Sequence, residues 1–129
     1  MSVFLDSDVL IDCLRGTPMA RDWLERNASE ALRIPGIVAM ELVVGCRDKA
    51  ALRRVDKLLD TFEIVWPDTA DFQHAYQLLT EHYLGSSIGI ADCLIAAMCQ
   101  RRSMLLYSFN LRHYRPIENL DIQEPYARG

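Results

Sequence analysis

Short segments that favour β-strands alternate with helical segments along the 129-residue chain, and this alternation restricts the possible folds more than any other feature. The strand-like segments are residues 2–5, 31–34, 63–66 and 104–107, with a weaker candidate at 121–122. Strands joined by helices usually pair in parallel within one sheet, and the helices then cover both of its faces. The pattern therefore predicts an α/β fold, a three-layer α/β/α domain around a central, mostly parallel sheet. A chain of this length suits one such domain.

Three helices are predicted between these strands. Apolar residues recur at helical spacing over residues 52–62 and again over residues 72–83. Asp48 and Asp68 stand just ahead of the two segments, where an aspartate side chain can accept a hydrogen bond from an unpaired amide of the first turn. A third helix is predicted over residues 18–27, because a proline at its start suits the first helical turn.

Three acidic residues lie in segments that are otherwise apolar. Asp6 directly follows the first strand-like segment, Glu41 is the one charged residue of segment 34–46, and Asp92 is the one charged residue of segment 83–100. A buried carboxylate without a partner is costly, so each of these residues needs an explanation. One explanation is structural: each acid is a helix cap or a paired core residue, and Asp92 suits the positive N-terminal end of a helix.

The other explanation is a shared site. Ligands of parallel α/β sheets bind beyond the carboxyl ends of the strands, and Asp6 lies at such an end. If the fold also brings Glu41 and Asp92 there, two unit charges about 4 Å apart repel each other by roughly 4 kcal/mol at an effective dielectric constant of about 20. A shared proton or a divalent cation removes this repulsion. Carboxylates without a histidine or cysteine ligand suit Mg²⁺ or Mn²⁺.

Two polar residues follow the strand-like segment 104–107. Ser108 stands at its end and Asn110 comes two residues later. A hydroxyl and an amide at the carboxyl end of a strand can hold a metal-bound water molecule. The alternative is a simple turn in which Asn110 is a cap.

Other polar residues have simpler interpretations. Asp8 is expected to be an acid of the first helical turn or an N-cap, and Asp12 to be solvated, close to Arg15. His74 and His82 are expected at the surface, because they fall outside the apolar stripe of their helix. The aromatic side chains exceed what one small core can hide, so some of them are expected at an interface; they are Trp23, Trp66, Phe72, Tyr76 and Tyr83.

Four fragments, in this order, resemble the motifs of the PIN-domain family and, within it, of the VapC-type toxins of bacterial toxin–antitoxin pairs. The first is VFLDSDVLIDCLRG, a strand that ends in an aspartate and continues into an apolar helix. The second is IVAMELVVG, with its acid at Glu41. The third and most specific is IGIADCLIAAMC, and the fourth is LLYSFNLRHYRPIENL. Together the fragments span nearly the whole chain.

This resemblance implies a single PIN-like nuclease domain over residues 1–129 and an endoribonuclease that depends on Mg²⁺ or Mn²⁺. It implies that Asp6, Glu41 and Asp92 are catalytic residues and metal ligands. Ser108 stands where the family often has threonine, and Asn110 stands where many members have a fourth acid. The implied partners are an RNA substrate, a VapB-type antitoxin and a second copy of the chain, without contact of this chain with DNA or a membrane.

The charge balance bears on how RNA is bound. The net charge is −4, so no general basic surface attracts nucleic acid, and local cations must do so. Arg15, Arg112 and His113 are the candidates, unless they are ordinary solvated charges. No signal peptide is expected, and the apolar run 93–99 is too short to cross a membrane. The four cysteines are expected to be reduced in a cytoplasmic protein.

Two rival functions fit parts of the sequence. The fragment FLDSD also suits a haloacid-dehalogenase-like phosphatase, with Asp6 as nucleophile and Asp8 as general acid. That class needs a lysine and an acidic pair after the serine that ends its later strand, and no lysine follows Ser108. The second rival is a PIN-like domain without catalysis that binds RNA or a protein partner. The intact trio Asp6, Glu41 and Asp92 disfavours it.

Overall fold

The structure is a computed structural model in which residues 2–128 are described. Its strands form one sheet in the order β3-β2-β1-β4-β5, and every pairing is parallel. The strands are β1 (Ser2–Leu5), β2 (Ala31–Pro35), β3 (Glu63–Val65), β4 (Leu105–Tyr107) and β5 (Ile122–Gln123). Each predicted strand is therefore confirmed to within one residue at either end, including the weak fifth candidate.

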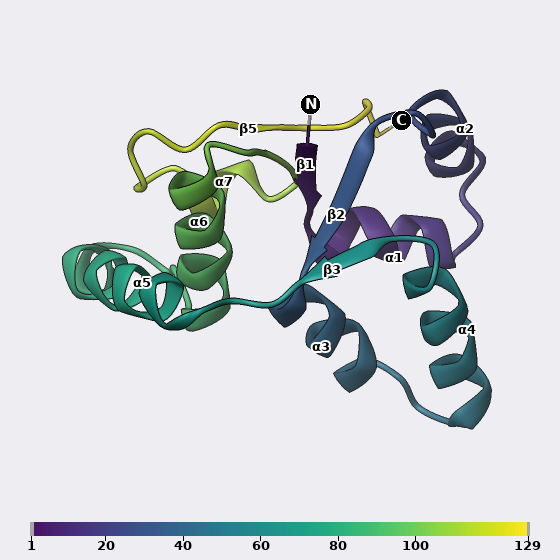
Figure 1. The fold of residues 1–129 in the computed structure, drawn as a ribbon, viewed down its shortest axis with the longest axis horizontal. Coiled ribbons are helices and arrows are strands. Elements are labelled where there is room, and N and C mark those ends of the chain that lie inside the picture. The colour runs from purple at the N-terminus through teal and green to yellow at the C-terminus, as the bar shows by residue number, and fades with distance from the viewer. Residues whose placement is uncertain (1, 129) are drawn as a thin grey trace.

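Helices cover both faces of this sheet, which confirms the predicted three-layer α/β/α architecture. Figure 1 shows α5 and α6 on one side of the sheet and α1, α2 and α4 on the other. The helices are α1 (Ser7–Leu14), α2 (Pro18–Arg26), α3 (Gly36–Val44), α4 (Lys49–Leu59), α5 (Thr69–His82), α6 (Ile90–Arg102) and α7 (Leu111–Tyr114), with a 3₁₀ turn η1 (Tyr83–Gly85) after α5.

The predicted N-caps are present. Asp48 accepts a hydrogen bond from the amide of Ala51 at 2.8 Å at the start of α4. Asp68 accepts one from the amide of Asp71, and the Asp71 side chain accepts one from the amide of Asp68, each at 2.8 Å. This reciprocal pair satisfies amides that a helix leaves unpaired in its first turn, so it fixes where α5 begins.

The core lies on both faces of the central strands, against α6 on one face and against α1 on the other, where Val9 and Leu10 are fully buried. Phe4 and Leu5 of β1 and Leu106 of β4 are fully buried, and every residue of α6 from Cys93 to Cys99 is buried as well. Burial of the whole run explains why the sequence is apolar on nearly all sides of this helix. All four cysteines are free thiols. Within residues 2–128, no helix combines the length and the apolar character needed to cross a membrane.

The apolar stripe predicted for α5 is only partly correct: Ala75 is buried and Leu79 is partly buried against the core, but the aromatic members of the stripe are not. Phe72, Tyr76 and Tyr83 are 54%, 69% and 62% exposed, whereas Leu78 is buried. The helix turns its acidic Asp71 inwards, because two arginines of α6 bind it there. The aromatic residues are therefore displaced to the surface.

Two expectations about polar residues are also corrected. Asp12 is buried rather than solvated, and its partners are Tyr126 and Arg128 rather than Arg15. His74 is half-buried, with Nε2 at 2.6 Å from Oε1 of Gln100 on α6. In both cases the partner comes from a segment distant in the sequence.

Candidate active site

Asp6 lies at the carboxyl end of β1 and caps the next helix. Its amide donates to the carbonyl of Tyr107 at 2.9 Å, which extends the pairing of β1 with β4 by one residue. Its side chain accepts from the amide of Ser7 at 2.8 Å, so the carboxylate is held at the first turn of α1. The side chain is buried, with 6% of the residue exposed.

Two hydroxyl groups also bind the Asp6 carboxylate. Ser108 Oγ donates to Oδ2 at 2.8 Å and Tyr114 Oη donates to the same oxygen at 3.0 Å. Burial raises the pKa of Asp6 although these bonds oppose the rise, and the negative charge of Asp92 raises it further. Ser108 was among the predicted site residues, whereas Tyr114 was missed, because only the fold brings the aromatic residue of α7 back to β1.

Asp8 lies beside this pair, in the first turn of α1 as expected. Its Oδ2 accepts from the amide of Phe109 at 3.0 Å and from Ser108 Oγ at 3.4 Å. Its Oδ1 is buried, and the described residues offer it no hydrogen-bond partner. Burial, followed by the charge of Asp6, raises the pKa of Asp8 to about 6.

Glu41 and Asp92 approach the end of β1 from α3 and α6. Partial burial raises the pKa of Glu41 to about 7, although its side chain remains open to solvent, and the charges of Asp6, Asp92 and Asp8 add to the rise. Asp92 Oδ2 accepts from the amide of Gly89 at 3.3 Å, so the structural interpretation of this residue as a helix cap is also correct. The fold thus brings the predicted acids within electrostatic reach of one another.

The loop after β4 supplies polar groups next to Asp92. The amide of Asn110 donates to Ser108 Oγ at 2.9 Å, so a turn is present as predicted, but the serine hydroxyl holds it and the Asn110 side chain makes no capping hydrogen bond with any described residue. His113 Nδ1 lies 2.8 Å from Asn110 Nδ2 and 3.7 Å from Asp92 Oδ2. His113 therefore belongs to the acidic site. The neighbouring Arg112 is exposed on the same short helix.

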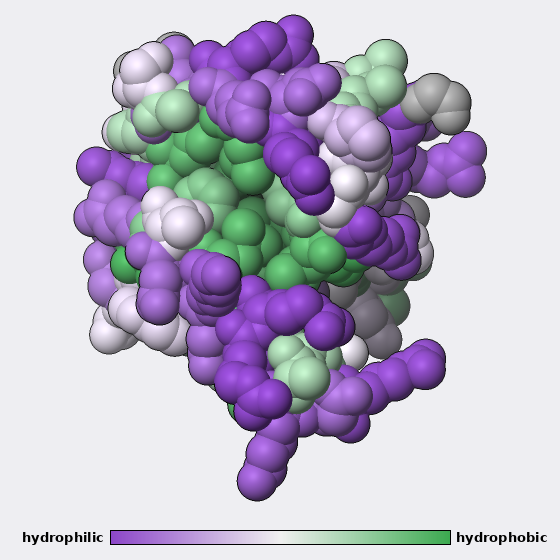
Figure 2. Space-filling model, turned by 90° about the vertical axis from the view of Figure 1, so that its right-hand side faces the viewer, coloured by the Kyte–Doolittle hydropathy of each residue, from purple (hydrophilic) through white to green (hydrophobic). Residues whose placement is uncertain are grey.

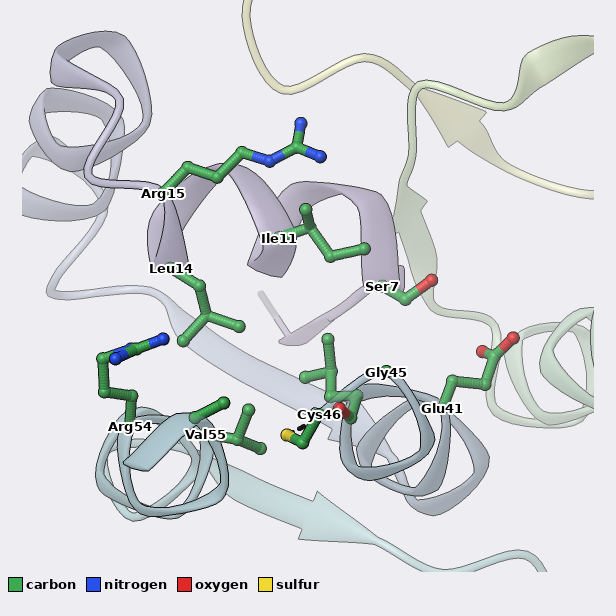
Figure 3. A pocket seen from close by; sticks show the side chains of 11 residues that line it. Ser7, Ile11, Leu14, Arg15, Glu41, Gly45, Cys46, Arg54 and Val55 are labelled. Atoms are coloured by element: carbon green, nitrogen blue, oxygen red, sulfur yellow. Dashed lines mark hydrogen bonds between the residues drawn. The ribbon is translucent and has the colours of Figure 1, made fainter. Parts of the chain in front are cut away.

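A cleft of about 610 Å³ is lined by one of the acids, Glu41, and by two arginines, Arg15 at the end of α1 and Arg54 of α4. Figure 3 shows Ser7 and Glu41 at one end of this cleft and Arg15 and Arg54 at the other, with apolar side chains between them. Arg15, predicted as a substrate contact, is thus separated from the acids by the length of the cleft. Arg54 was not predicted, because its position on the polar side of a helix gives no sign of a cleft.

The acidic site suits a hydrated divalent cation. Within residues 2–128, no three Asp, Glu, His or Cys side chains are close enough to ligate one ion together. Magnesium, however, keeps several of its waters and binds directly to only one or two carboxylates. Carboxylates that raise one another's pKa, together with the buried Oδ1 of Asp8, which lacks a hydrogen-bond partner among the described residues, form a carboxylate-rich environment that such an ion would stabilise.

Fold and site together define a class of protein. Residues 3–118 match the PIN domain, and the chain belongs to the PIN-domain family. The predicted resemblance to this family is therefore confirmed. Membership disfavours the phosphatase alternative, as does Asp8, whose Oδ2 is already bound by the Ser108–Phe109 turn.

Particular relatives within this family can be named. Ribonuclease VapC10 from Mycobacterium tuberculosis is 32% identical over 127 residues, which cover 97% of this chain and 93% of that protein. VapBC from Salmonella typhimurium, solved bound to DNA, is 26% identical with a TM-score of 0.83, covering 98% of this chain and 100% of that one. VapBC2 from Rickettsia felis, solved with a promoter DNA fragment, shares the fold with a TM-score of 0.84 at 24% identity, covering 96% of this chain and 98% of that one.

Proposed function

We propose that the chain is the toxin of a VapBC-type toxin–antitoxin pair and a metal-dependent endoribonuclease with one nuclease domain over residues 1–129. The observation that carries this proposal is the gathering of Asp6, Glu41 and Asp92 beside Ser108, in a chain of the PIN-domain family that is 32% identical to a ribonuclease. A protein that only binds RNA has no need for carboxylates whose charges repel one another and the RNA.

Asp6 and Asp92 are the proposed direct ligands of Mg²⁺ or Mn²⁺, and Glu41 is proposed to act on the ion through a water molecule and to orient the attacking water, because no three carboxylates of the described residues come close enough to ligate one ion together. The ion, when bound, lowers the pKa of water and neutralises charge on the phosphate. Ser108 and Tyr114 fix the Asp6 carboxylate by donating hydrogen bonds to Oδ2. The amide of Ser7 donates to the other oxygen, Oδ1. Hydrolysis of a phosphodiester depends mainly on such positioning and charge stabilisation.

The contacts of the loop after β4 support a proposed catalytic role for it. Asn110 holds the Ser108 hydroxyl and lies against His113, which itself approaches Asp92. His113 and Arg112 are the proposed contacts for the phosphate next to the cleaved bond, and Arg15 for a more distant one. These few cations let RNA approach a protein of net charge −4. The protein is proposed to act in the cytoplasm, without contacting DNA or a membrane.

The cleft between α1 and α4 is the proposed binding site of the antitoxin. Figure 2 shows an apolar area ringed by hydrophilic residues on the face of the molecule that carries these helices. Ile11, Leu14 and Val55 line the cleft, Glu41 marks its acidic end and Arg54 its basic end. A partner segment with an apolar middle, a basic side chain facing Glu41 and an acidic one facing Arg54 would match it. Inhibition that survives neutralising every basic residue of that segment would contradict the charge match.

RNA cleavage by the purified chain, freed of any antitoxin, tests the proposal. We expect cleavage with Mg²⁺ or Mn²⁺, its loss with EDTA, and its loss in Asp92→Asn with an unchanged circular dichroism spectrum. Asp22→Asn, which changes an exposed acid of α2, should cleave like the wild type. Cleavage by Asp92→Asn at the wild-type rate would show the assigned role to be wrong, and RNA binding without cleavage by the wild type would favour the domain without catalysis.

A further inference from the structure

The C-terminal segment (residues 124–128) lies against α1 and is anchored there. Figure 1 shows this yellow end of the chain running from the α6 side of the molecule towards α2. Arg128 binds the carboxylate of Asp12 with two nitrogens, Nε to Oδ2 at 3.2 Å and Nη2 to Oδ1 at 3.1 Å. Tyr126 Oη donates to Asp12 Oδ2 at 2.8 Å. Because Asp12 is buried, this charged contact fixes the position of both side chains.

The same two side chains hold Phe109 of the loop after β4. The guanidinium carbon of Arg128 lies 3.8 Å from the centre of the Phe109 ring, a cation–π arrangement. The Tyr126 ring meets the Phe109 ring edge to face, with 5.0 Å between the centres. Phe109 is therefore fixed by groups that are themselves fixed on α1.

The position of Phe109 in turn determines where two hydrogen-bond donors, the Ser108 hydroxyl and the Phe109 amide, meet the carboxylates of the site. Its amide donates to Asp8 Oδ2 at 3.0 Å, and the preceding residue, Ser108, donates to Asp6 Oδ2 at 2.8 Å. A displacement of the Phe109 ring would move this peptide and both donors. Arg128 also reaches the backbone carbonyl of Asp8 at 3.4 Å, so it touches both sides of the contact between α1 and the loop.

We propose that Tyr126 and Arg128 are positioning residues of the acidic site, which hold the Ser108–Asn110 turn so that its donors stay on Asp6 and Asp8. Neither residue needs to touch RNA for this role, since both act through the Phe109 ring and the Asp12 carboxylate. The consequence for catalysis rests on the proposed function, whereas the positioning itself can be measured without RNA.

The test compares Arg128→Gln, Arg128→Lys and Tyr126→Phe with the wild type in the full chain. Hydrogen–deuterium exchange measures the backbone amides of Phe109 and Asn110, and calorimetry measures Mn²⁺ affinity. In Arg128→Gln we expect exchange at these amides to rise about tenfold while β1 and α6 exchange as in the wild type. Mn²⁺ should bind about tenfold more weakly, as when the partner of a metal ligand is lost. RNA cleavage should lose kcat more than it changes KM.

Arg128→Lys keeps the charge but loses the planar, two-nitrogen contact, so it should restore little of either property. Tyr126→Phe keeps the ring, so amide exchange and Mn²⁺ affinity should each change by only about threefold. If Arg128→Gln does not fold, the result for Tyr126→Phe tests the proposal instead. Arg26→Gln, an exposed arginine of α2, is the matched control.

Unchanged exchange at Phe109 and unchanged Mn²⁺ affinity in Arg128→Gln, relative to Arg26→Gln, would overturn the proposal. Exchange that rises equally throughout the chain would also overturn it, because that result describes a general loss of stability. A wild type that cleaves no RNA would refute the proposed function instead, and the exchange and Mn²⁺ measurements would still decide this inference.

Discussion

At the scale of single residues, the acids of the site differ in how the fold treats them. The carboxylate of Asp6 is buried and accepts three hydrogen bonds. The side chain of Glu41 is open to solvent, and its pKa is raised by partial burial and by the charges of the neighbouring acids. Burial and these charges raise the pKa of Asp8 from 3.8 to about 6 and that of Glu41 from 4.5 to about 7. Folding therefore favours the protonated form of both side chains.

This preference makes stability depend on pH. For a group whose pKa is raised by folding, the stability contribution is complete below the unfolded pKa and is lost as pH rises through the folded pKa. The metal-free protein should accordingly lose stability between about pH 4 and pH 7. Asp8→Asn, which can still accept the Phe109 amide, should remove part of this loss and gain on the order of 2 kcal/mol at pH 8. Urea unfolding across this pH range measures it, and an equal loss in wild type and variant would contradict it.

The same pKa values predict how metal binding depends on pH. A divalent cation binds deprotonated carboxylates, so Mn²⁺ affinity should rise with pH until Glu41 is ionised, at about 7. Glu41→Gln should bind Mn²⁺ more weakly at pH 8 but lose this rise between pH 6 and pH 8. Calorimetric titrations at several pH values test this, and a rise of the same size in the variant would assign it to another group.

At the scale of elements, α5 and α6 are joined by a buried ionic contact. Asp71 is fully buried and binds Arg102 through both of its oxygens, at 2.7 and 2.8 Å, and Arg101 at 2.8 Å. Burial alone would raise the pKa of Asp71, but the bonds from Arg102, the Asp68 amide and Arg101 hold it well below its usual range. The stability it contributes is therefore present above about pH 4 and is lost as pH falls below that value.

Asp71→Asn should destabilise the protein by about 2 kcal/mol, because the partly exposed Arg102 loses its two-oxygen contact. Arg101 loses Asp71 but keeps its contact with Asp68. Asp56→Asn, on the exposed side of α4, is the control and should have almost no effect. Thermal and urea unfolding measure the difference between the two variants. Equal stability of both would mean that the contact contributes nothing.

The entry into α3, which carries Glu41, depends on a glycine. A methyl group on Gly36 would overlap the six-membered ring of Trp66, which follows β3. Gly36→Ala should therefore displace the indole, change the tryptophan fluorescence and lower the melting temperature. Adding Trp66→Ala should relieve the overlap, so the double variant should be more stable than Gly36→Ala alone. A double variant that is less stable would show that the indole does not limit this position.

The elements also show how far the sequence could predict the structure. Strand ends could be predicted, because each of the strands β1 to β4 stops at a polar residue or near a proline. β1 stops at Asp6 and β4 at Ser108, whereas β2 ends at Pro35 and β3 ends just before Trp66 and Pro67. The caps Asp48 and Asp68 were equally visible, since capping depends on residues three apart. The contacts of Tyr114 with Asp6 and of Arg128 with Asp12 could not be predicted, because they join residues more than 100 positions apart whose approach depends on the completed fold.

At the scale of the whole molecule, exposed apolar side chains are where we propose that a second copy of the chain binds. The expected surplus of aromatics is confirmed for four of five residues, since Trp66, Phe72, Tyr76 and Tyr83 are exposed while Trp23 is buried. Leu84 and Ile90 are also exposed, at 95% and 73%. Leu84, Ile90 and Tyr83 also line one apolar cleft of about 520 Å³. Exposed apolar surface of this kind marks interaction sites, and two-fold dimers are the commonest homo-oligomers.

Leu84→Glu should therefore convert a dimer into a monomer without lowering the stability of the fold, because the side chain is almost fully exposed. Sedimentation velocity at micromolar concentration measures the change. Met19→Glu, at an exposed apolar position on α2, should leave the dimer intact. A wild type that sediments as a monomer would contradict the proposed dimer, and a dimeric Leu84→Glu would place the interface elsewhere.

The central claim is that the acids at the end of β1 hold the divalent cation at which RNA is cleaved. Anomalous diffraction from crystals soaked in Mn²⁺ tests it most directly, because the signal locates the ion without reference to activity. The account predicts one strong peak at direct ligand distance, about 2.0–2.6 Å, from carboxylate oxygens of Asp6 and Asp92, with Glu41 reaching it through a water molecule. At saturating Mn²⁺, no peak at this edge of the sheet, or a peak that Asp6 and Asp92 do not ligate, would contradict the claim.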